Sequence, residues 1–124
     1  MPVPRITKEE LKQRLDGPPE QAPAILDVRL KYPFEHSTVT LPGAIRMAPG
    51  ALDTARLPRD RDIVLYDSDP DELVSERVAA ELIRHGYRAV ALKGGIGEWV
   101  VAKLPVDSKP APQPLAPATG AAKG

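Results

Sequence analysis

The sequence predicts an α/β fold in which a small, mostly parallel β-sheet of about five strands has helices on both faces. Strand-like and helix-like patterns alternate along residues 1–104, which is typical of parallel strands joined by right-handed helical crossovers. The clearest strand, Ile63–Tyr66, is apolar at every position and suits the buried centre of such a sheet. The apolar residues that follow it repeat at helical spacing, at Val74, Val78 and Leu82.

The N-terminal part predicts an edge strand and a capped helix. Residues 3–6 form a short segment with flanking proline, which suits the edge of a sheet. Thr7 and Glu10 have the spacing of a capping box, a pattern that starts a helix. The helix should end at residues 17–19, where a glycine and two prolines follow one another.

Three weaker elements are predicted between this helix and the central strand. They are a β-rich run followed by a long loop, a second short strand and a short helix. In chain order they occupy residues 24–28, 44–47 and 51–57. In open α/β sheets, ligands bind at the carboxyl ends of the strands. The loops after Val28 and Tyr66 are therefore the expected positions for chemistry.

The helix after the central strand has a well-marked start and end. Asp69 can act as its N-cap, Pro70 suits the first helical position, and Glu72 lies three residues after the cap. Gly86 is expected to end the helix. The rest of the domain predicts a strand, a glycine-rich turn and a closing helix, over residues 88–92, 94–97 and 98–104.

Composition places the chain among globular proteins and excludes several functions. Its 124 residues suffice for one domain, and a formal net charge of zero gives no sign of the basic surface that binders of nucleic acids or membranes carry. No apolar run could cross a bilayer and the N-terminus resembles no secretion signal, so we expect a cytoplasmic protein. Proline, alanine and glycine dominate residues 105–124, and we expect a disordered tail there, after a domain over residues 1–104.

Three blocks of the sequence resemble the rhodanese-like (rhodanese-homology) domain family. They are similar to the family's D-V-R and I-P-G-A-I pattern, to its central strand with the helix that follows, and to its G-F-x-x-V, L-x-G-G and W ending. In chain order they are residues 26–29 with 41–45, residues 63–66 with 75–82, and residues 86–99. The resemblance covers roughly residues 5–104 and implies the rhodanese-like form of the α/β fold.

The resemblance also implies where the family's reactive site would lie. In active relatives, a catalytic cysteine follows the central strand, and backbone N–H groups of its loop stabilise the thiolate and then the persulfide. The matching position here is Asp67, and the matching loop is Asp67-Ser68-Asp69-Pro70-Asp71-Glu72. The whole chain contains no cysteine. Because a carboxylate cannot carry a sulfane sulfur, we identify no catalytic residue.

The residues leave three interpretations of Asp67. We favour the one in which its carboxylate accepts hydrogen bonds from N–H groups of its own loop. The second is a nucleophile for phosphoryl transfer, although residues 67–72 include four carboxylates and no base to neutralise a phosphate. The third is a cation site, because the alternating aspartates copy the start of a calcium loop, but Glu72 and Val78 stand where glycine and glutamate are required. We predict neither a metal nor another cofactor.

The remaining candidates suggest support of the loop rather than catalysis. Asp27 and Arg29 match family positions that brace the active loop, and we expect them to form a structural ion pair at the strand end. Ser68 and His36 could form a Ser/His pair, but no third group completes it. We therefore predict a catalytically inactive binding or regulatory module whose partner is an unknown protein or a small thiol. The alternative is a sulfurtransferase that relies on an external thiol.

Overall fold

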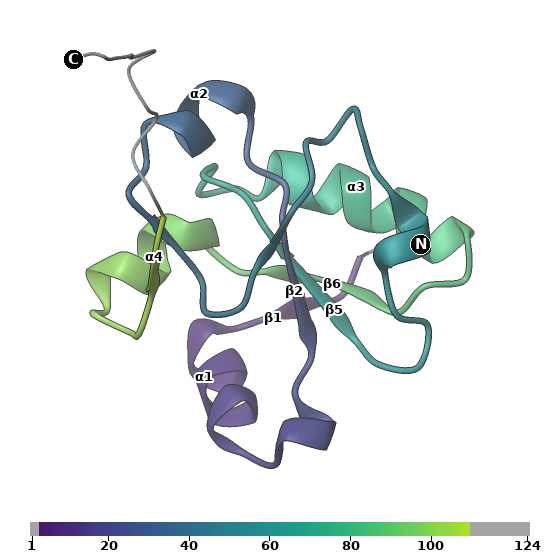
Figure 1. Cartoon of the computed structure of the whole chain (residues 1–124), viewed down its shortest axis with the longest axis horizontal. Coiled ribbons are helices and arrows are strands. Elements are labelled where there is room, and N and C mark those ends of the chain that lie inside the picture. Colours follow the sequence, from purple (N-terminus) through teal and green to yellow (C-terminus); the bar gives the residue numbers. More distant parts are fainter. Residues whose placement is uncertain (1–2, 110–124) are drawn as a thin grey trace, which may run out of the picture.

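The computed structural model describes residues 3–109, and its main sheet has five parallel strands in the order β1-β6-β5-β2-β4 (Figure 1). These strands are β1 (Arg5–Ile6), β2 (Ala24–Asp27), β4 (Ile45–Arg46), β5 (Ile63–Tyr66) and β6 (Ala89–Leu92). A separate antiparallel pair joins β3 (Val39–Thr40) to β7 (Asp107–Ser108). The predicted parallel sheet, with Ile63–Tyr66 as its central strand, is confirmed.

Four α-helices accompany the sheet in the described part of the chain. They are α1 (Lys8–Asp16), α2 (Lys31–Glu35), α3 (Leu73–Arg84) and α4 (Gly95–Val101). Two short 3-10 helices lie at Pro19–Gln21 and Thr54–Arg56. Among residues 3–109, no helix combines the length and the apolar character needed to span a bilayer.

The central strand shows why both faces of the sheet carry helices. Ile63 and Leu65 lie in a core cluster with the buried side of α3. Val64 and Tyr66 point to the other face, where they share a cluster with residues of α1 and α4, including the fully buried Trp99. Because side chains alternate along a strand, a run that is apolar at every position can be buried only in this way. Helices on both faces are thus confirmed.

The capping box at the start of α1 is confirmed as well. The backbone N–H of Glu10 donates to the Thr7 hydroxyl at 3.1 Å, and the backbone N–H of Thr7 donates to the Glu10 carboxylate at 2.9 Å. The helix ends at Asp16, immediately before Gly17. Both ends of this helix therefore follow the sequence signals.

The predicted start of the long helix is wrong. Helix α3 begins at Leu73, so Pro70 lies outside it, and Asp69 is not its N-cap. The aspartates of the loop instead bind nearby backbone: the N–H of Asp69 donates to Asp67 at 2.9 Å, and that of Asp71 donates to Asp69 at 2.8 Å. Aspartate offers the backbone such local turns in competition with the helix.

Two elements differ from the predictions between β2 and β5. The long loop after β2 contains the short helix α2, whose Phe34 lies beneath the guanidinium groups of Arg29 and Arg46. In place of the short helix predicted over residues 51–57, only the 3-10 turn Thr54–Arg56 forms. Long-range packing fixes α2, and a local pattern could not indicate it.

The C-terminal elements also begin and end elsewhere than predicted. Helix α4 starts at Gly95, inside the predicted glycine turn, because burial of both Ile96 and Trp99 on one side requires a helical turn there. Beyond Leu104, where we predict the domain to end, β7 pairs with β3, and the indole N–H of Trp99 donates to the carbonyl of Pro105 at 2.7 Å. The rest of the predicted tail, residues 110–124, lies outside the described residues.

Candidate functional site

The candidate site lies between β2 and β5, where successive connections lead to opposite edges of the sheet. The chain leaves β2 towards β4 on one side of the sheet and leaves β5 towards β6 on the other. The loops after β2 and β5 therefore diverge at the carboxyl ends of two neighbouring strands, which is where open α/β sheets bind ligands. Residues 67–72 form the loop after β5, and residues 28–30 lead from β2 to α2.

The carboxylate of Asp67 is buried inside its own loop. Asp67 is 1% exposed. One of its oxygens accepts the N–H of Asp69 at 2.9 Å, and the other accepts the N–H of Ser75 at 2.6 Å. Its backbone carbonyl accepts the N–H of Ile96 at 2.9 Å, which ties the loop to the start of α4. Both carboxylate oxygens are thus directed at backbone donors.

The bond to Ser75 gives Asp67 a capping function. Ser75 is the third residue of α3, so its N–H is one of the first four, which have no partner within the helix. A carboxylate that accepts such a group also interacts favourably with the positive end of the helix dipole. The sequence pattern assigned this capping to Asp69, whereas the structure assigns it to Asp67.

Burial raises the pKa of the Asp67 carboxyl above its ordinary value of 3.8. The N–H groups of Ser75 and Asp69 lower the pKa but do not offset the loss of solvent, and the neighbouring Asp69 charge raises it further. The folded pKa therefore exceeds the unfolded one. Protonated Asp67 therefore contributes to the free energy of unfolding. This contribution is complete below pH 3.8 and is lost as the pH rises through the raised pKa.

We expect the side-chain carboxyl carbon of Asp67 to titrate with a midpoint above 3.8 in a carbon-detected NMR experiment on the folded protein. Asp69→Asn should move this midpoint downwards, because the substitution removes the Asp69 charge and keeps an oxygen for the Asp71 N–H. A midpoint at or below the ordinary value in the native protein would show that the N–H groups outweigh burial.

Glu72 holds the other end of the loop, and the sequence did not indicate this function. Its backbone is left-handed, with φ 55° and ψ 33°, which is uncommon for a residue other than glycine. One carboxylate oxygen accepts from the Arg5 guanidinium at 2.6 Å, and the other accepts the N–H of Gly94 at 3.0 Å. Arg5 also pairs with Glu76 of α3. Glu72 therefore joins the loop to β1 and to the residues before α4.

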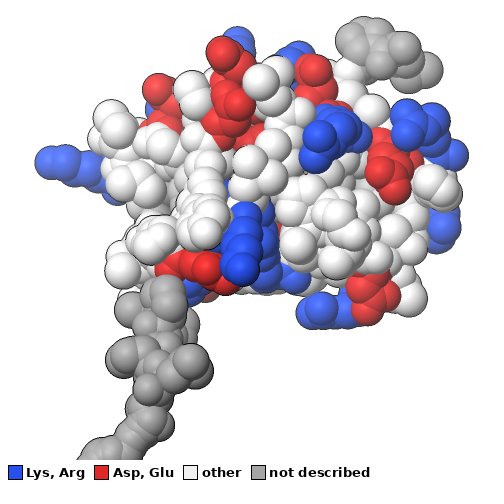
Figure 2. Space-filling model, turned by 90° about the horizontal axis from the view of Figure 1, so that it is seen from above, with Lys and Arg blue, Asp and Glu red and all other residues white. Residues whose placement is uncertain are grey.

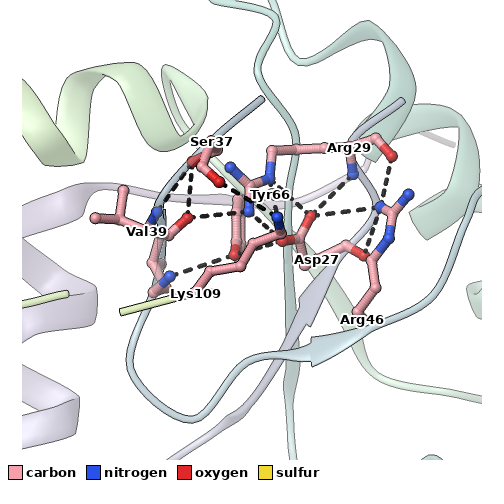
Figure 3. A network of polar contacts seen from close by, with 8 residues as sticks. Asp27, Arg29, Ser37, Val39, Arg46, Tyr66 and Lys109 are labelled. Atoms are coloured by element: carbon pink, nitrogen blue, oxygen red, sulfur yellow. Dashed lines mark hydrogen bonds and ion pairs between the residues drawn. The ribbon is translucent and has the colours of Figure 1, made fainter. Parts of the chain in front are cut away.

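Asp27 and Arg29 form a buried ion pair at the end of β2 (Figure 3). The Arg29 side chain donates to both Asp27 oxygens, with N–O distances of 2.6 to 3.0 Å, and its backbone N–H donates to one of them at 3.0 Å. The same guanidinium donates to the carbonyl of Val39 at 3.1 Å. Asp27 also accepts the Tyr66 hydroxyl at 2.8 Å. This pair therefore connects the ends of β2 and β5 to β3.

Aromatic rings enclose the charged group of Arg29. Its guanidinium carbon lies 5.2 Å from the ring centre of Phe34 and 5.5 Å from that of Tyr66, and Arg46 lies 4.0 Å from the Phe34 ring. Burial, followed by the nearby Asp27 charge, raises the pKa of Tyr66. Its hydroxyl therefore stays protonated and donates a hydrogen bond to Asp27. Among residues 3–109, neither Asp27 nor Arg29 forms a side-chain hydrogen bond with residues 67–72. The direct braces of the loop are Arg5, Gly94 and Ile96.

The geometry gives no support to the other interpretations of the loop. Both oxygens of Asp67 accept N–H groups and one oxygen of Asp69 does too, so neither side chain is directed at a common centre. Across residues 3–109, no three His, Asp or Glu side chains are grouped as a metal ion requires. Ser68 and His36 share no hydrogen bond in this part of the chain, and the His36 ring is stacked on Tyr32.

Comparisons with known proteins identify the fold and the family of this chain. The rhodanese-like domain family matches residues 7–102. A full-length protein from Lactobacillus plantarum has 23% sequence identity and a TM-score of 0.73, over 85% of this chain and 88% of its own. A rhodanese-like domain protein from Staphylococcus aureus has 22% identity and a TM-score of 0.64, over 78% of this chain and 91% of its own.

A thiosulfate sulfurtransferase from Pseudomonas aeruginosa has 22% identity and a TM-score of 0.66, over 85% of this chain but 19% of its own. At these identities the solved structures support the fold alone. The curated proteins include no match. The family match, however, extends over most of the chain and includes β2, β5, the loop 67–72 and α3. The chain therefore belongs to the rhodanese-like domain family.

Proposed function

We propose that this protein is a catalytically inactive rhodanese-like domain that acts as a binding or regulatory module. The observation that supports this best is the position of the Asp67 carboxylate. It follows the central strand, where the family resemblance implies a reactive cysteine, and its oxygens accept the N–H groups of Asp69 and Ser75. A carboxylate in this position accepts backbone N–H groups of the loop and of the first turn of α3 but cannot form a persulfide.

The charge of the loop also argues against the family reaction. Asp69 and Asp71 form no ion pair within residues 3–109, and Asp71 is exposed. An anionic sulfur donor such as thiosulfate would be repelled by these carboxylates. The loop is nevertheless well braced, because Arg5 and the N–H groups of Gly94 and Ile96 bind it from two sides. A preformed loop of this kind suits recognition of a partner protein.

Turnover by the native chain tests this proposal. We expect thiosulfate and cyanide to give no more thiocyanate with the purified protein than without it, both alone and with added glutathione. The glutathione arm addresses the alternative, a sulfurtransferase that uses an external thiol.

Thiocyanate formation that requires the protein would contradict the proposal. An Asp67→Ala preparation, purified in parallel, is the matched control for contaminating enzyme. Turnover of equal size in both preparations is assigned to contamination only if it disappears on further purification. Turnover that follows this chain through purification would establish an activity that does not depend on a cysteine of its own.

A further inference from the structure

Strand β1 forms one edge of the main sheet, and its outer side pairs with no other strand in the described part of the chain. On its inner side, the carbonyl of Pro4 accepts the N–H of Ala91 at 3.0 Å. The carbonyl of Ile6 likewise accepts the N–H of Lys93 at 2.9 Å. Because successive residues of a strand direct their backbone groups to opposite sides, the N–H and carbonyl of Arg5 point outward. Proline often protects such an edge by lacking an N–H, but Pro4 lies in the phase that faces β6.

A groove of about 240 Å³ lies between this edge and helix α3. Its lining consists of Val3, Ala80, Ile83 and Arg84, so its walls are mostly apolar. Val3 is buried in the core cluster against which Ala80 and Ile83 pack. The side chain of Arg5, two residues further along β1, points to α3 as well. A strand added beside β1 would therefore direct every second side chain towards this groove.

The unpaired charges beside the groove are basic. Arg77 and Arg84 are exposed and lie two turns apart on the same side of α3. Neither forms an ion pair within residues 3–109, although Glu81 lies on the same helix, and Glu76 already pairs with Arg5. On the face seen in Figure 2, charges of both signs are interspersed with uncharged surface, without a large area of one sign. Recognition at the groove therefore depends on these two arginines rather than on a broad basic surface.

We propose that the outer edge of β1 binds an extended acidic segment of a partner protein, which adds a strand to the sheet. An aliphatic side chain of that segment fills the groove, and the carboxylates two residues before and after it face Arg77 and Arg84. Those carboxylates are about 13 Å apart along a strand. The two arginines are seven residues apart, or about 10.5 Å along α3, and their long side chains cover the difference.

A second copy of this chain suits the edge less well. Antiparallel pairing of two β1 strands about a two-fold axis keeps both α3 helices on the same face, so the arginines of both copies repel one another across the axis. The inference goes beyond the proposed function, because it gives the chemistry of a partner at a surface other than the loop 67–72. It holds whether or not that loop has activity.

A palindromic peptide tests the edge without assuming the direction of the added strand. The probe is acetyl-Thr-Asp-Thr-Leu-Thr-Asp-Thr-amide, whose leucine and aspartates share one face of a strand. With the full-length protein, we expect it to slow amide hydrogen exchange at Arg5 and to shift the amide resonances of Val3 and Ile83. At about ten times a dissociation constant of about 1 mM, the Arg5 amide should exchange about tenfold more slowly, since only free molecules exchange there.

Matched variants separate strand addition from general attraction. Arg84→Glu should weaken binding of the probe about threefold to tenfold and strengthen that of a peptide with lysine in place of both aspartates. Lys12→Glu changes the net charge equally but lies on α1, at the other face of the sheet, and should leave both affinities close to native. N-methylation of the leucine and the next threonine removes one N–H from each side of the strand and should abolish the slower exchange at Arg5.

Three results would overturn the proposal: unchanged exchange at Arg5, equal effects of Arg84→Glu and Lys12→Glu, or equal binding of the methylated peptide. Slower exchange at Arg5 when the protein alone is concentrated would place a second copy of the chain on the edge and would also overturn it.

Discussion

Arg29→Ala should lower the free energy of unfolding by about 3–5 kcal/mol, because it leaves the buried carboxylate of Asp27 without its main partner. Asp27 is fully buried, and Arg29 supplies three of the N–H donors of this pair through its side chain and backbone. The substitution also removes the donor to the carbonyl of Val39 and the cation that lies between the rings of Phe34 and Tyr66. Urea unfolding followed by circular dichroism measures the change.

Arg88→Ala is the matched control for this prediction. The Arg88 side chain is 57% exposed and pairs with Asp62 at 3.1 Å. Exposed pairs of this kind contribute about 0–1 kcal/mol, so the control should unfold close to the native midpoint. Similar losses in the two variants would show that burial does not decide the strength of these ion pairs.

Gly95→Ala should have the second largest effect, because two independent costs combine at this position. The residue has a φ of +65°, and a left-handed conformation costs an alanine about 1–2 kcal/mol. A Cβ here would lie 2.6 Å from the carbonyl oxygen of Asp67 and 3.2 Å from that of Asp69. Since both neighbours are backbone atoms, the loop must shift, and overpacking adds about 1–3 kcal/mol. We therefore expect a loss of about 2–5 kcal/mol in the free energy of unfolding.

Gly97→Ala is the matched control, two residues further along α4. It tests whether α4 is destabilised by any glycine-to-alanine substitution or only by the one at Gly95. A Cβ at Gly97 meets no atom within 4 Å, and the residue is within the helix. Alanine is preferred to glycine in a helix by about 0.5–1 kcal/mol, so this variant should be slightly more stable than the native protein. Destabilisation of the two variants to the same extent would contradict the close approach of Gly95 to the loop.

Local signals in the sequence were sufficient for much of the fold. Ile63–Tyr66 was predicted with its observed bounds, because a short run that is apolar on both faces suits only a covered strand. The capping box at Thr7 could also be predicted, since both of its partners lie within one helical turn. The position of Asp67 came from the family resemblance, which aligned the loop with the end of the central strand.

The contacts that brace the loop could not be predicted in the same way. Arg5 and Glu72 are 67 positions apart in the sequence, and only the pairing of β1 with β6 brings them together. The prediction that Asp69 caps α3 was wrong, because a local rule cannot decide between neighbouring aspartates. Burial of Asp67 favours its bond to Ser75, which is eight residues further along the chain. Helix α2 depends on the packing of Phe34 against arginines from other segments.

Thiocyanate formation by Asp67→Cys, with the native protein as the control, tests the central claim most directly. The claim is that the loop keeps the backbone N–H groups that suit an anionic sulfur and lacks only the thiol. With thiosulfate and cyanide as substrates, we predict slow turnover by the variant and none by the native protein. The turnover is slow because Asp69 and Asp71 repel the thiosulfate anion without blocking the loop. Turnover by the native protein, or a folded variant that remains inactive, would contradict the claim.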